Sequence, residues 1–379
     1  MSWSLSPVEV GQLLRLLRSS HWVATTIDVL DLDHKFQGSL SSSFLSGSVN
    51  VDATAEVTRS MSAEFFESRM NVPIVPRSPS MGAAYQKRML QATYHVWDRN
   101  HRFSFPVFTG PIDKVDRDGE ILKIECQGKE ILSSGAIWSS KDYPSGWNKS
   151  SLIQDILTTM SGEAFYDIEP TDQITAEKTV LDRENSTVWS TVKSLAESMG
   201  KTAFYNGSGR LQIRSLPGSP ALTVDPTYAL GDPQDSYSSE STANAVEVTG
   251  ATPRGSKKPL VAKVFAPDEH PLSAKNLGRN GVPRFLPIIE QNQDLKTQAA
   301  VENRADSLLR EALLQSIDVV IPLIPIPGID ERDLIRFEFP DFSADVRVKQ
   351  YTFPLLVGEV MSFGYLQASE VTEMSVRKQ

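Results

Sequence analysis

The stretch from Gly47 to Glu67, GSVNVDATAEVTRSMSAEFFE, constrains the fold most. Apolar residues occupy every second position from Val49 to Val57, with Asn, Asp, Thr and Glu between them. Residues two apart in a strand point to the same face, so this pattern predicts one long, half-buried strand. Beyond it the apolar side is carried by Met61, Ala63 and Phe65, and we expect a bulge or bend at Arg59-Ser60. So long a strand favours a strongly curved sheet or a barrel.

Length and charge limit the classes of protein that this sequence can encode. The chain has 379 residues, which at ~100–200 residues per domain predicts two to four domains. Its formal net charge is -9 and its pI is about 5.2, which argues against general nucleic-acid binding, because that function needs a concentrated basic surface. An acidic surface along a DNA passage would instead repel the duplex and let it slide.

The single cysteine and the N-terminus carry further limits. One cysteine, Cys126, allows no intrachain disulfide and no thiolate metal cluster, and its alternation with Ile124 predicts a buried structural thiol. No segment reaches the ~18 apolar residues of a membrane helix. The N-terminus does not match a signal peptide and predicts a short amphipathic helix instead, with an apolar side of Val8, Leu13, Leu16 and Leu17.

Residues 20–135 read as one antiparallel β unit. After a strand over Trp22–Leu32 we expect a Gly- and Ser-rich loop at 34–46, and after the long strand a Pro-containing extended loop at 70–81. Further strands are predicted over 85–97, 103–116 and 120–127, the last two joined by an Asp116–Gly119 turn. Many strands without helices suggest a barrel or sandwich.

The middle of the chain changes to mixed α/β character. Apolar residues at helical spacing predict helices over 150–160 and 187–199, ended by Gly162 and Gly200, with Asn185 or Ser186 as a cap of the second. A hairpin follows, with its turn at residues 206–209. Residues 217–242 contain several prolines and serines, which is linker composition.

The C-terminal part combines strands with the clearest helix of the sequence. Strands are predicted over 245–250 and 261–265, then a long polar loop over 266–287, a helix over 294–315 capped by Asp294, and strands over 334–339, 344–352 and 360–365. The predicted fold class is α+β, mainly β. The predicted domains are 1–136 (β-rich, with the short helix), 137–235 (small α/β domain and linker) and 236–379 (β-rich, with the long helix).

Candidate metal sites are weak. His95 and His101 flank Asp98 near a predicted turn, where they could approach each other, although a polar turn is the favoured interpretation. Asp113, Asp116 and Asp118 resemble part of a calcium loop, but the distal glutamate of an EF-hand is missing and turn chemistry accounts for them. We assign no catalytic, cofactor-binding or metal-ligating residue.

Three other groups of residues leave alternatives open. Glu163, Asp167 and Glu169 follow a helix end and could form a hydrolase carboxylate pair. Trp138, Tyr143 and Trp147 could stack on a sugar, or pack between the first β unit and the α/β unit. Arg254 and Lys257-Lys258 could bind phosphate, or form a solvated loop tip.

The order of these segments resembles the tail hub, or baseplate hub, proteins of tailed phages and related contractile injection machines. The resemblance rests on GSVNVDATAEVTRSMSAEF, FTGPIDKVDRDGEILKIECQGKEI, SSLIQDILTTMSG and STVWSTVKSLAESMGKTAFYNGSGRLQI, in this order. Each motif is weak alone, and their succession spans nearly the whole chain. It looks most like the hubs described as minor tail proteins in actinobacterial phages.

The resemblance implies two tail-tube-like β-barrels flanking the small α/β domain, and a non-enzymatic homotrimer in the virion tail, assembled in the host cytoplasm. The trimer would adapt a sixfold tail tube or distal tail ring to a threefold spike, fibre or tape-measure protein and line the DNA channel. It implies no cofactor, no sequence-specific nucleic-acid binding and no membrane insertion. The alternatives are another tail-tip component that binds a receptor or carbohydrate, and a hydrolase. Since the sequence ends at Gln379, soon after the last predicted strand, we expect any lytic activity to reside in another chain.

Overall fold

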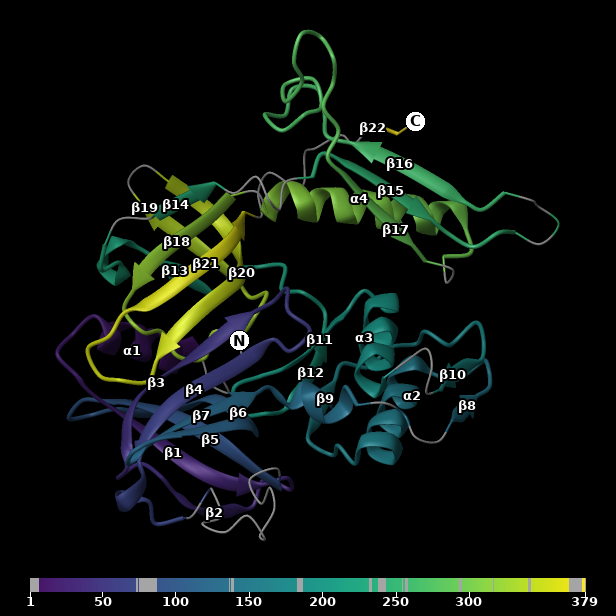
Figure 1. The fold of residues 1–379 in the computed structure, drawn as a ribbon. Helices are drawn as coiled ribbons and strands as arrows, with labels where there is room; N and C mark the ends of the chain where they lie inside the picture. The colour runs from purple at the N-terminus through teal and green to yellow at the C-terminus, as the bar shows by residue number, and fades with distance from the viewer. Residues whose placement is uncertain are drawn as a thin grey trace. The chain divides into compact units, whose positions relative to one another are not determined.

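The computed structural model divides the chain into two compact units. It describes residues 7–72, 74, 87–135, 137, 140–182, 187–231, 234–237, 243–253, 255, 258–292, 295–315, 317–339, 342–367 and 377–378. The first unit comprises Met1–Gly231, Pro322–Ile335 and Val348–Phe363, and the second comprises Asp232–Ile321, Arg336–Arg347 and Gly364–Gln379. Each unit is described by itself below (Figure 1).

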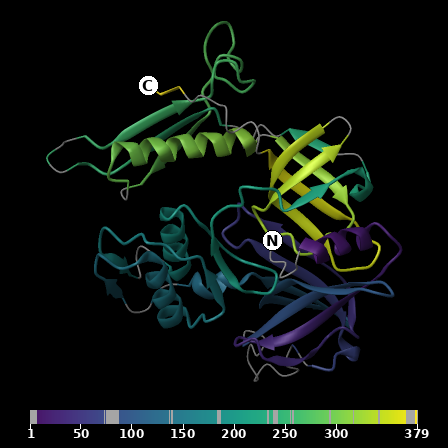
Figure 2. The same cartoon turned by 180° about the vertical axis from the view of Figure 1, so that it is seen from behind.

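The first unit is built on a large antiparallel sheet. Its strands follow the order β3-β4-β7-β6-β5-β1-β2, and neighbours pair antiparallel. Their bounds are β1 (Trp22–Asp31), β2 (Phe36–Ser39), β3 (Phe44–Asp52), β4 (Arg59–Phe66), β5 (Arg88–Trp97), β6 (Arg102–Asp118) and β7 (Ile121–Gln127). Figures 1 and 2 show these strands in purple and blue, crossing one another at steep angles as in a strongly twisted sheet. Helix α1 (Pro7–Leu17) precedes them.

The stretch 47–67 is a hairpin, so the prediction of one long strand with a bulge at Arg59-Ser60 was wrong. The chain reverses between β3 and β4, which places Val49 opposite Met61. The Asp52 side chain accepts a hydrogen bond from the backbone N–H of Thr54 at 2.8 Å, an Asx turn that starts the reversal. The alternation of apolar and polar residues suggested a single strand because the odd-numbered residues face inward in both β3 and β4.

Other local predictions also need correction. Residues 36–39 of the predicted loop form β2, which pairs with β1. In α1, Leu13, Leu16 and Leu17 are buried as expected, but Val8 is 70% exposed and lies off the apolar side. Most of the predicted loop 70–81 lies outside the described residues.

A compact α/β portion follows the large sheet in the chain. Its elements are β8 (Lys141–Tyr143), α2 (Lys149–Ile156, continued by a π-helical turn over Leu157–Ser161), β9 (Tyr166–Ile168), β10 (Thr179–Leu181), α3 (Val188–Ser198), β11 (Thr202–Tyr205) and β12 (Leu211–Arg214). β11 and β12 form the predicted hairpin, and β9 joins β12 in parallel. Gly162 closes the first helix at φ 69°, and Gly200 follows the second at φ 73°, both in the left-handed region that glycine tolerates.

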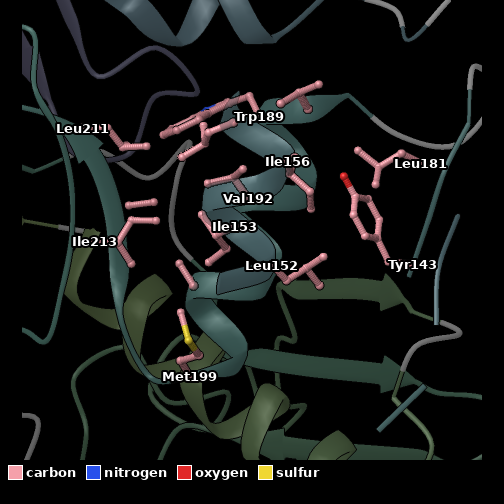
Figure 3. Close-up of a cluster of buried hydrophobic side chains, with 14 of the residues drawn as sticks. Tyr143, Leu152, Ile153, Ile156, Leu181, Trp189, Val192, Met199, Leu211 and Ile213 are labelled. Atoms are coloured by element: carbon pink, nitrogen blue, oxygen red, sulfur yellow. The ribbon is translucent and has the colours of Figure 1, made fainter. Parts of the chain in front are cut away.

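Each of these helices is capped by the side chain of the residue directly before it. Asn148 caps α2 by accepting from the backbone N–H of Ser151, and Thr187 forms a capping box with Ser190 at the start of α3. The cap of α3 is therefore Thr187, whereas the two predicted candidates, Asn185 and Ser186, lie outside the described residues. Trp189 and Val192 of α3 pack against Ile153 and Ile156 of α2 and against the hairpin residues Leu211 and Ile213 in one apolar core (Figure 3).

Part of the predicted linker 217–242 forms secondary structure, and the division between the two units falls within it, after Gly231. The segment contains β13 (Leu222–Val224), a 3₁₀ turn (Pro226–Tyr228) and β14 (Gln234–Tyr237). β13 pairs with β19 (Leu334–Phe339), and Leu222, Val224 and Tyr228 are buried. Pro220 and Pro226 flank β13 and do not interrupt it, so the proline content of the segment did not exclude a strand.

Four C-terminal strands contribute residues to both units. They are β18 (Ile317–Leu323), β19, β20 (Phe342–Pro354) and β21 (Met361–Gln367). Within the first unit, residues Gln350 to Pro354 of β20 pair antiparallel with β3 and extend the large sheet.

In the second unit, helix α4 (Gln298–Gln315) covers one face of a small sheet, as both ribbon views show (Figures 1 and 2). The strands are β15 (Ala245–Thr249), β16 (Val261–Phe265), β17 (Pro287–Gln291) and β22 (Arg377–Lys378), in the order β17-β15-β16-β22. Val301, Ala305 and Leu309 of α4 pack on the inner side chains of the sheet. Strand β17 parallels β15 and falls at the end of the predicted loop 266–287. In the same unit, β14 pairs antiparallel with the start of β18.

The predicted fold class, α+β and mainly β, is confirmed. The predicted helix 294–315 is found as α4, which starts at Gln298; Thr297 accepts a hydrogen bond from the N–H of Ala300, and the predicted cap Asp294 lies outside the described residues. Among the described residues, no helix combines the length and the hydrophobicity that a membrane crossing requires.

We predict that Ile153→Ala destabilises the first unit by roughly 2–5 kcal/mol, because it empties part of a closely packed core. Ile153 is fully buried there. The matched control is Ile174→Ala, since Ile174 is 59% exposed in the same unit, and it should change the free energy of unfolding by less than about 1 kcal/mol. Urea unfolding of both variants measures the difference, and equal effects would contradict the packing described.

Candidate functional site: a buried charge cluster in the first unit

Arg59, the first residue of β4, is the centre of a cluster of buried charged side chains. Only 3% of its surface is exposed. Its guanidinium donates to Asp330 Oδ1 (2.9 Å), Glu331 Oε2 (2.9 Å), the Tyr351 hydroxyl (3.2 Å) and the carbonyl oxygens of Tyr205 (3.0 Å) and Val107 (3.4 Å). A guanidinium has five N–H groups, so each donor has one partner.

These partners come from segments that are far apart in the sequence. Val107 lies on β6, Tyr205 ends β11, and Tyr351 lies on β20, while Asp330 and Glu331 lie in the connection between β18 and β19. One side chain therefore ties the large sheet to the α/β hairpin and to a C-terminal connection. Because a buried charge without partners is costly, this set of bonds stabilises one arrangement of the segments.

Gly207 permits the hairpin turn to approach β6 closely. A Cβ atom at this position would lie 2.2 Å from the carbonyl oxygen of Pro106, which no side chain could tolerate. The Thr109 hydroxyl donates to the Gly207 carbonyl at 3.0 Å and holds the turn against β6. The Asn-Gly pair, predicted as a turn signal, thus also serves packing.

A second set of contacts surrounds Thr58. Its hydroxyl oxygen lies 2.8 Å from Glu130 Oε1 and 2.8 Å from Glu331 Oε1, and its N–H donates to Glu130 Oε1 at 3.3 Å. Glu130 is fully buried in the 3₁₀ turn Lys129–Ser133 that follows β7, and its Oε2 has no hydrogen-bond partner.

Two further ion pairs border the cluster. Lys129 is 2% exposed and lies 2.7 Å from Glu163 Oε2 and 2.9 Å from His34 Nε2. Arg214 on β12 lies 2.9 Å from Asp333 Oδ1, and the second oxygen of Asp333 accepts from the N–H of Asp330 at 2.9 Å. The pair between Lys129 and Glu163 ties the end of β7 to the α/β portion.

Burial shifts the ionisation of this cluster. It raises the pKa of Glu130 to about 7, and it raises the pKa of Asp330 to about 6 against the opposing effect of Arg59. Burial also lowers the pKa of Lys129, although Glu163 opposes the shift, and it lowers the pKa of His34 together with the nearby Lys129 charge. Desolvation disfavours every charged form here, so the favourable pairs decide which groups stay ionised.

Within the described residues, the cluster borders two cavities, and the one lined by Thr58 and Glu331 together with Trp189 has a volume of about 50 Å³. The cavity beside Arg59 and Asp330 has a volume of only about 10 Å³, about the space that one water molecule needs. Its lining includes Val107, Gly207 and Tyr351.

The structure separates the residues of the predicted histidine site. His95 bonds to Ser104 (2.7 Å) and Thr26 (3.0 Å), while the ring of His101 lies 3.5 Å from Asp98. Within the described part of the chain, no three His, Cys, Asp or Glu side chains gather as metal ligands.

The predicted acidic groups have other partners or lie apart from each other. Glu163 pairs with Lys129, Glu169 accepts from the backbone and hydroxyl of Ser215, and Asp167 is exposed on β9. Asp113, Asp116 and Asp118 lie along β6 rather than in its turn, so the turn interpretation was wrong for them.

Two of the three predicted aromatic residues pack in or against the α/β core, while the third and most of the predicted basic group lie outside the described residues. Tyr143 is buried in the α/β core and donates to Asp155 at 2.7 Å, while Trp147, 37% exposed, packs edge-on against it with ring centres 5.6 Å apart. Trp138, Arg254 and Lys257 lie outside the described residues. Cys126 is buried, as predicted, and burial raises the pKa of its thiol strongly.

The large sheet also carries a surface that we call the polar face. It comprises outward side chains on three adjacent strands and on the paired end of β20: Ser46, Ser48, Asn50, Ser60, Ser62, Glu64, Lys123, Glu125, Gln127 and Thr352. In the sheet register Ser48 lies opposite Ser62, which lies opposite Glu125. The one lysine of this set pairs with Glu125 at 3.2 Å, so the face presents small hydroxyl groups and a slight excess of negative charge.

Sequence reasoning missed the charge cluster. A signal was present for Arg59, which occupies the same inward-facing phase as Met61, Ala63 and Phe65. A charged residue in an inward position is rarely fully buried unless it is paired. Its partners in the segment Asp330–Asp333 lie about 270 residues away, at a separation that no local pattern reports.

We predict that Arg59→Met destabilises the first unit by roughly 3–5 kcal/mol, because it leaves Asp330 and Glu331 buried without their cation. The matched control is Arg117→Met, which removes an exposed ion pair to Glu67 at 2.7 Å and should cost at most about 1 kcal/mol. Urea unfolding at neutral pH measures both. Similar small losses would show that the cluster contributes little to stability.

Comparison with known proteins gives matches in structure alone. No protein-family model and no curated protein matches the sequence. The fold is similar to the 43 kDa tail protein of prophage MuSo2 from Shewanella oneidensis (TM-score 0.60, 12% identity, 92% of this chain and 100% of that chain) and to a tail protein from Neisseria meningitidis (TM-score 0.60, 11% identity, 92% and 98%).

A third similar structure is a prophage tail protein from Listeria monocytogenes, with a TM-score of 0.50, 12% identity, and 92% of this chain matched to 96% of that chain. At these identities the similarities report the fold. Over the 92% of its length that these matches cover, the chain has the fold of phage and prophage tail proteins, as the order of its sequence motifs predicted.

Proposed function

We propose that this chain is a structural component of a phage tail: the hub of the baseplate or tail tip, present as a homotrimer in the virion tail. The observation that carries the proposal is the extent of the structural match. Three tail proteins agree with 92% of this chain, and between 96% and 100% of each of them is matched. Agreement over complete chains favours a shared structural role more than one shared domain would.

In this proposal the trimer adapts two symmetries. Each chain supplies two tail-tube-like barrels, so three chains give a ring with six similar positions on one side and threefold symmetry on the other. The sixfold side would bind the tail tube or distal tail ring, and the threefold side a spike, fibre or tape-measure protein. Assembly would take place in the host cytoplasm, and the chain would have no catalytic role.

Free strand edges support self-assembly. Within the described residues of the first unit, β2 ends its sheet and has β1 as its partner, and its Phe36 is 65% exposed. In the second unit, β17 ends the small sheet and exposes Ile289 by 65%. Exposed edges with apolar side chains are poorly tolerated by isolated proteins, so pairing or coverage by other subunits is the expected remedy.

The polar face supports a position along the DNA channel. A protein that holds DNA neutralises phosphates with lysine and arginine. On this face Lys123 is paired with Glu125, and Lys114 of the neighbouring β6, which lies opposite Glu125 in the sheet, is paired with Asp116 at 2.6 Å. A duplex would find no phosphate-binding positions there and could pass without being retained.

The rigidity of the first unit fits the same role. A hub must transmit load between its neighbours without rearranging, and the Arg59 cluster ties the sheet, the hairpin and the C-terminal connection together by buried bonds. We expect this cluster to keep the segments in register under load.

We predict a mass close to three times 41.9 kDa for the purified chain. Light scattering at several concentrations measures it. A dimer or hexamer would contradict the threefold hub. A stable monomer at all concentrations would count against self-assembly, and then binding to tail-tube or distal-ring protein would be the remaining measurement for a hub that trimerises on the tail.

We also predict that the polar face of one chain faces those of its partners across the channel. The native thiol of Cys126 is buried, so an introduced cysteine can be modified selectively. Ser62→Cys, on the polar face, should be converted to covalent dimers and trimers by a long bis-maleimide. Ser151→Cys, exposed on α2, is the matched control and should be labelled without such products.

If both variants are labelled and neither is crosslinked in a sample shown to be trimeric, the face does not line the channel, although the trimer itself would stand. Equal crosslinking of both would also contradict the assignment.

A further inference from the structure

The Thr58 hydroxyl contacts two carboxyl oxygens, although it has only one proton to donate. A threonine hydroxyl has one proton to donate, yet its oxygen lies 2.8 Å from a carboxyl oxygen of Glu130 and 2.8 Å from one of Glu331. If both carboxyls were ionised, one of these contacts would bring two unprotonated oxygens together in a buried site. Such a contact is repulsive and would not persist at hydrogen-bond distance.

The other partners of the two carboxyls indicate which one is ionised. Glu331 Oε2 accepts from the Arg59 guanidinium at 2.9 Å, so a negative charge on Glu331 is directly paired. Among the described residues, the donors that contact the Glu130 carboxyl are neutral: the hydroxyl and N–H of Thr58 reach Oε1, the backbone N–H of Glu130 itself also bonds the carboxyl, and Oε2 is buried without a hydrogen bond to another described residue. A neutral carboxylic acid fits this environment better than an anion.

We propose that Glu130 binds a proton at mildly acidic pH and donates it to the Thr58 hydroxyl, which in turn donates to ionised Glu331, so that the chain Glu130–Thr58–Glu331–Arg59 is a proton-dependent joint between β4 and the connection 329–333. The proton site is a property of the folded chain and does not depend on the hub assignment.

The charged groups around Glu130 come from several elements. Nearest in sequence is Lys129, which Glu163 neutralises. The acids on the C-terminal connection, Asp330, Glu331 and Asp333, face two cations, Arg59 on β4 and Arg214 on β12. The remaining titratable neighbours are Tyr205 on β11, Tyr351 on β20 and His34 before β2. With Glu130 ionised, the four acids Glu130, Asp330, Glu331 and Asp333 would be opposed by Arg59 and Arg214, with Arg332 on the same connection beside the cavity that Thr58 and Glu331 line, so one bound proton reduces the buried negative charge.

The pKa of Glu130 supports the direction of the effect. Burial raises it from 4.5 to about 7, so the folded state holds a proton that the unfolded state releases between these pH values. The stabilising effect of this proton is fully present below pH 4.5 and is lost as the pH rises to about 7 and beyond. Mildly alkaline pH should therefore loosen the joint.

The test is the pH dependence of unfolding for the full chain and for Glu130→Gln. Glutamine keeps the shape, can donate its amide N–H to Thr58 and cannot ionise. Between pH 4.5 and 8 the folding equilibrium constant of the natural chain should fall on the order of 10²-fold more than that of Glu130→Gln. The matched control is Glu64→Gln on the polar face of β4, where the carboxylate accepts from Ser46 at 3.1 Å, and it should keep the pH profile of the natural chain.

Infrared spectroscopy in D₂O supplies a direct readout at pH 6. The natural chain should show the absorption band of protonated carboxyl groups, to which Asp330 with its pKa of about 6 also contributes, and Glu130→Gln should lose the larger part of it. Glu331→Gln should keep the band while destabilising the protein at all pH values, because Arg59 loses an anion. Parallel pH profiles for the natural chain and Glu130→Gln, or loss of the band in Glu331→Gln alone, would overturn the proposal.

Discussion

The buried guanidinium of Arg59 is the interaction on which the first unit depends. An arginine in a sheet interior is tolerable only if each of its five donors is paired, and here the partners are two acids, a tyrosine hydroxyl and two backbone carbonyls from separate segments. Apolar contacts would tolerate small shifts of these segments. Charged bonds at 2.9–3.4 Å are directional, so the cluster specifies their alignment as well as stabilising it.

The same cluster contains more carboxyls than cations, and this imbalance explains the proton on Glu130. The Thr58 hydroxyl accepts from Glu130 and donates to Glu331, which in turn accepts from Arg59. The protonation of Glu130 therefore affects every hydrogen bond of the joint. A rigid connection that depends on a proton differs from one built of apolar contacts alone, because it responds to pH without any change in composition.

These features fit the structural role that we propose. The matched tail proteins share its fold over 92% of the chain, its polar face offers no free cation within the residues that define it, and the cavity beside Arg59 has room for about one water molecule. The function we propose uses surfaces and edges rather than a reactive centre. Attachment within the chain and attachment between chains then become the properties that mutations should affect most.

The sequence by itself determined the secondary structure of the strongly periodic segments. Residue spacing, helix caps and turn residues, which are local properties, predicted the helices α2, α3 and α4 and the hairpin with its turn at Asn206–Gly209. They also predicted the burial of Cys126. The hairpin at 47–67 could be recognised from the tertiary structure alone, because the odd-numbered residues face inward in both β3 and β4 and the alternation shows no break at the turn. The tertiary structure alone paired β13 with β19 and joined Arg59 to Asp330 and Glu331, since such contacts depend on the packing of distant segments, which no local pattern reports.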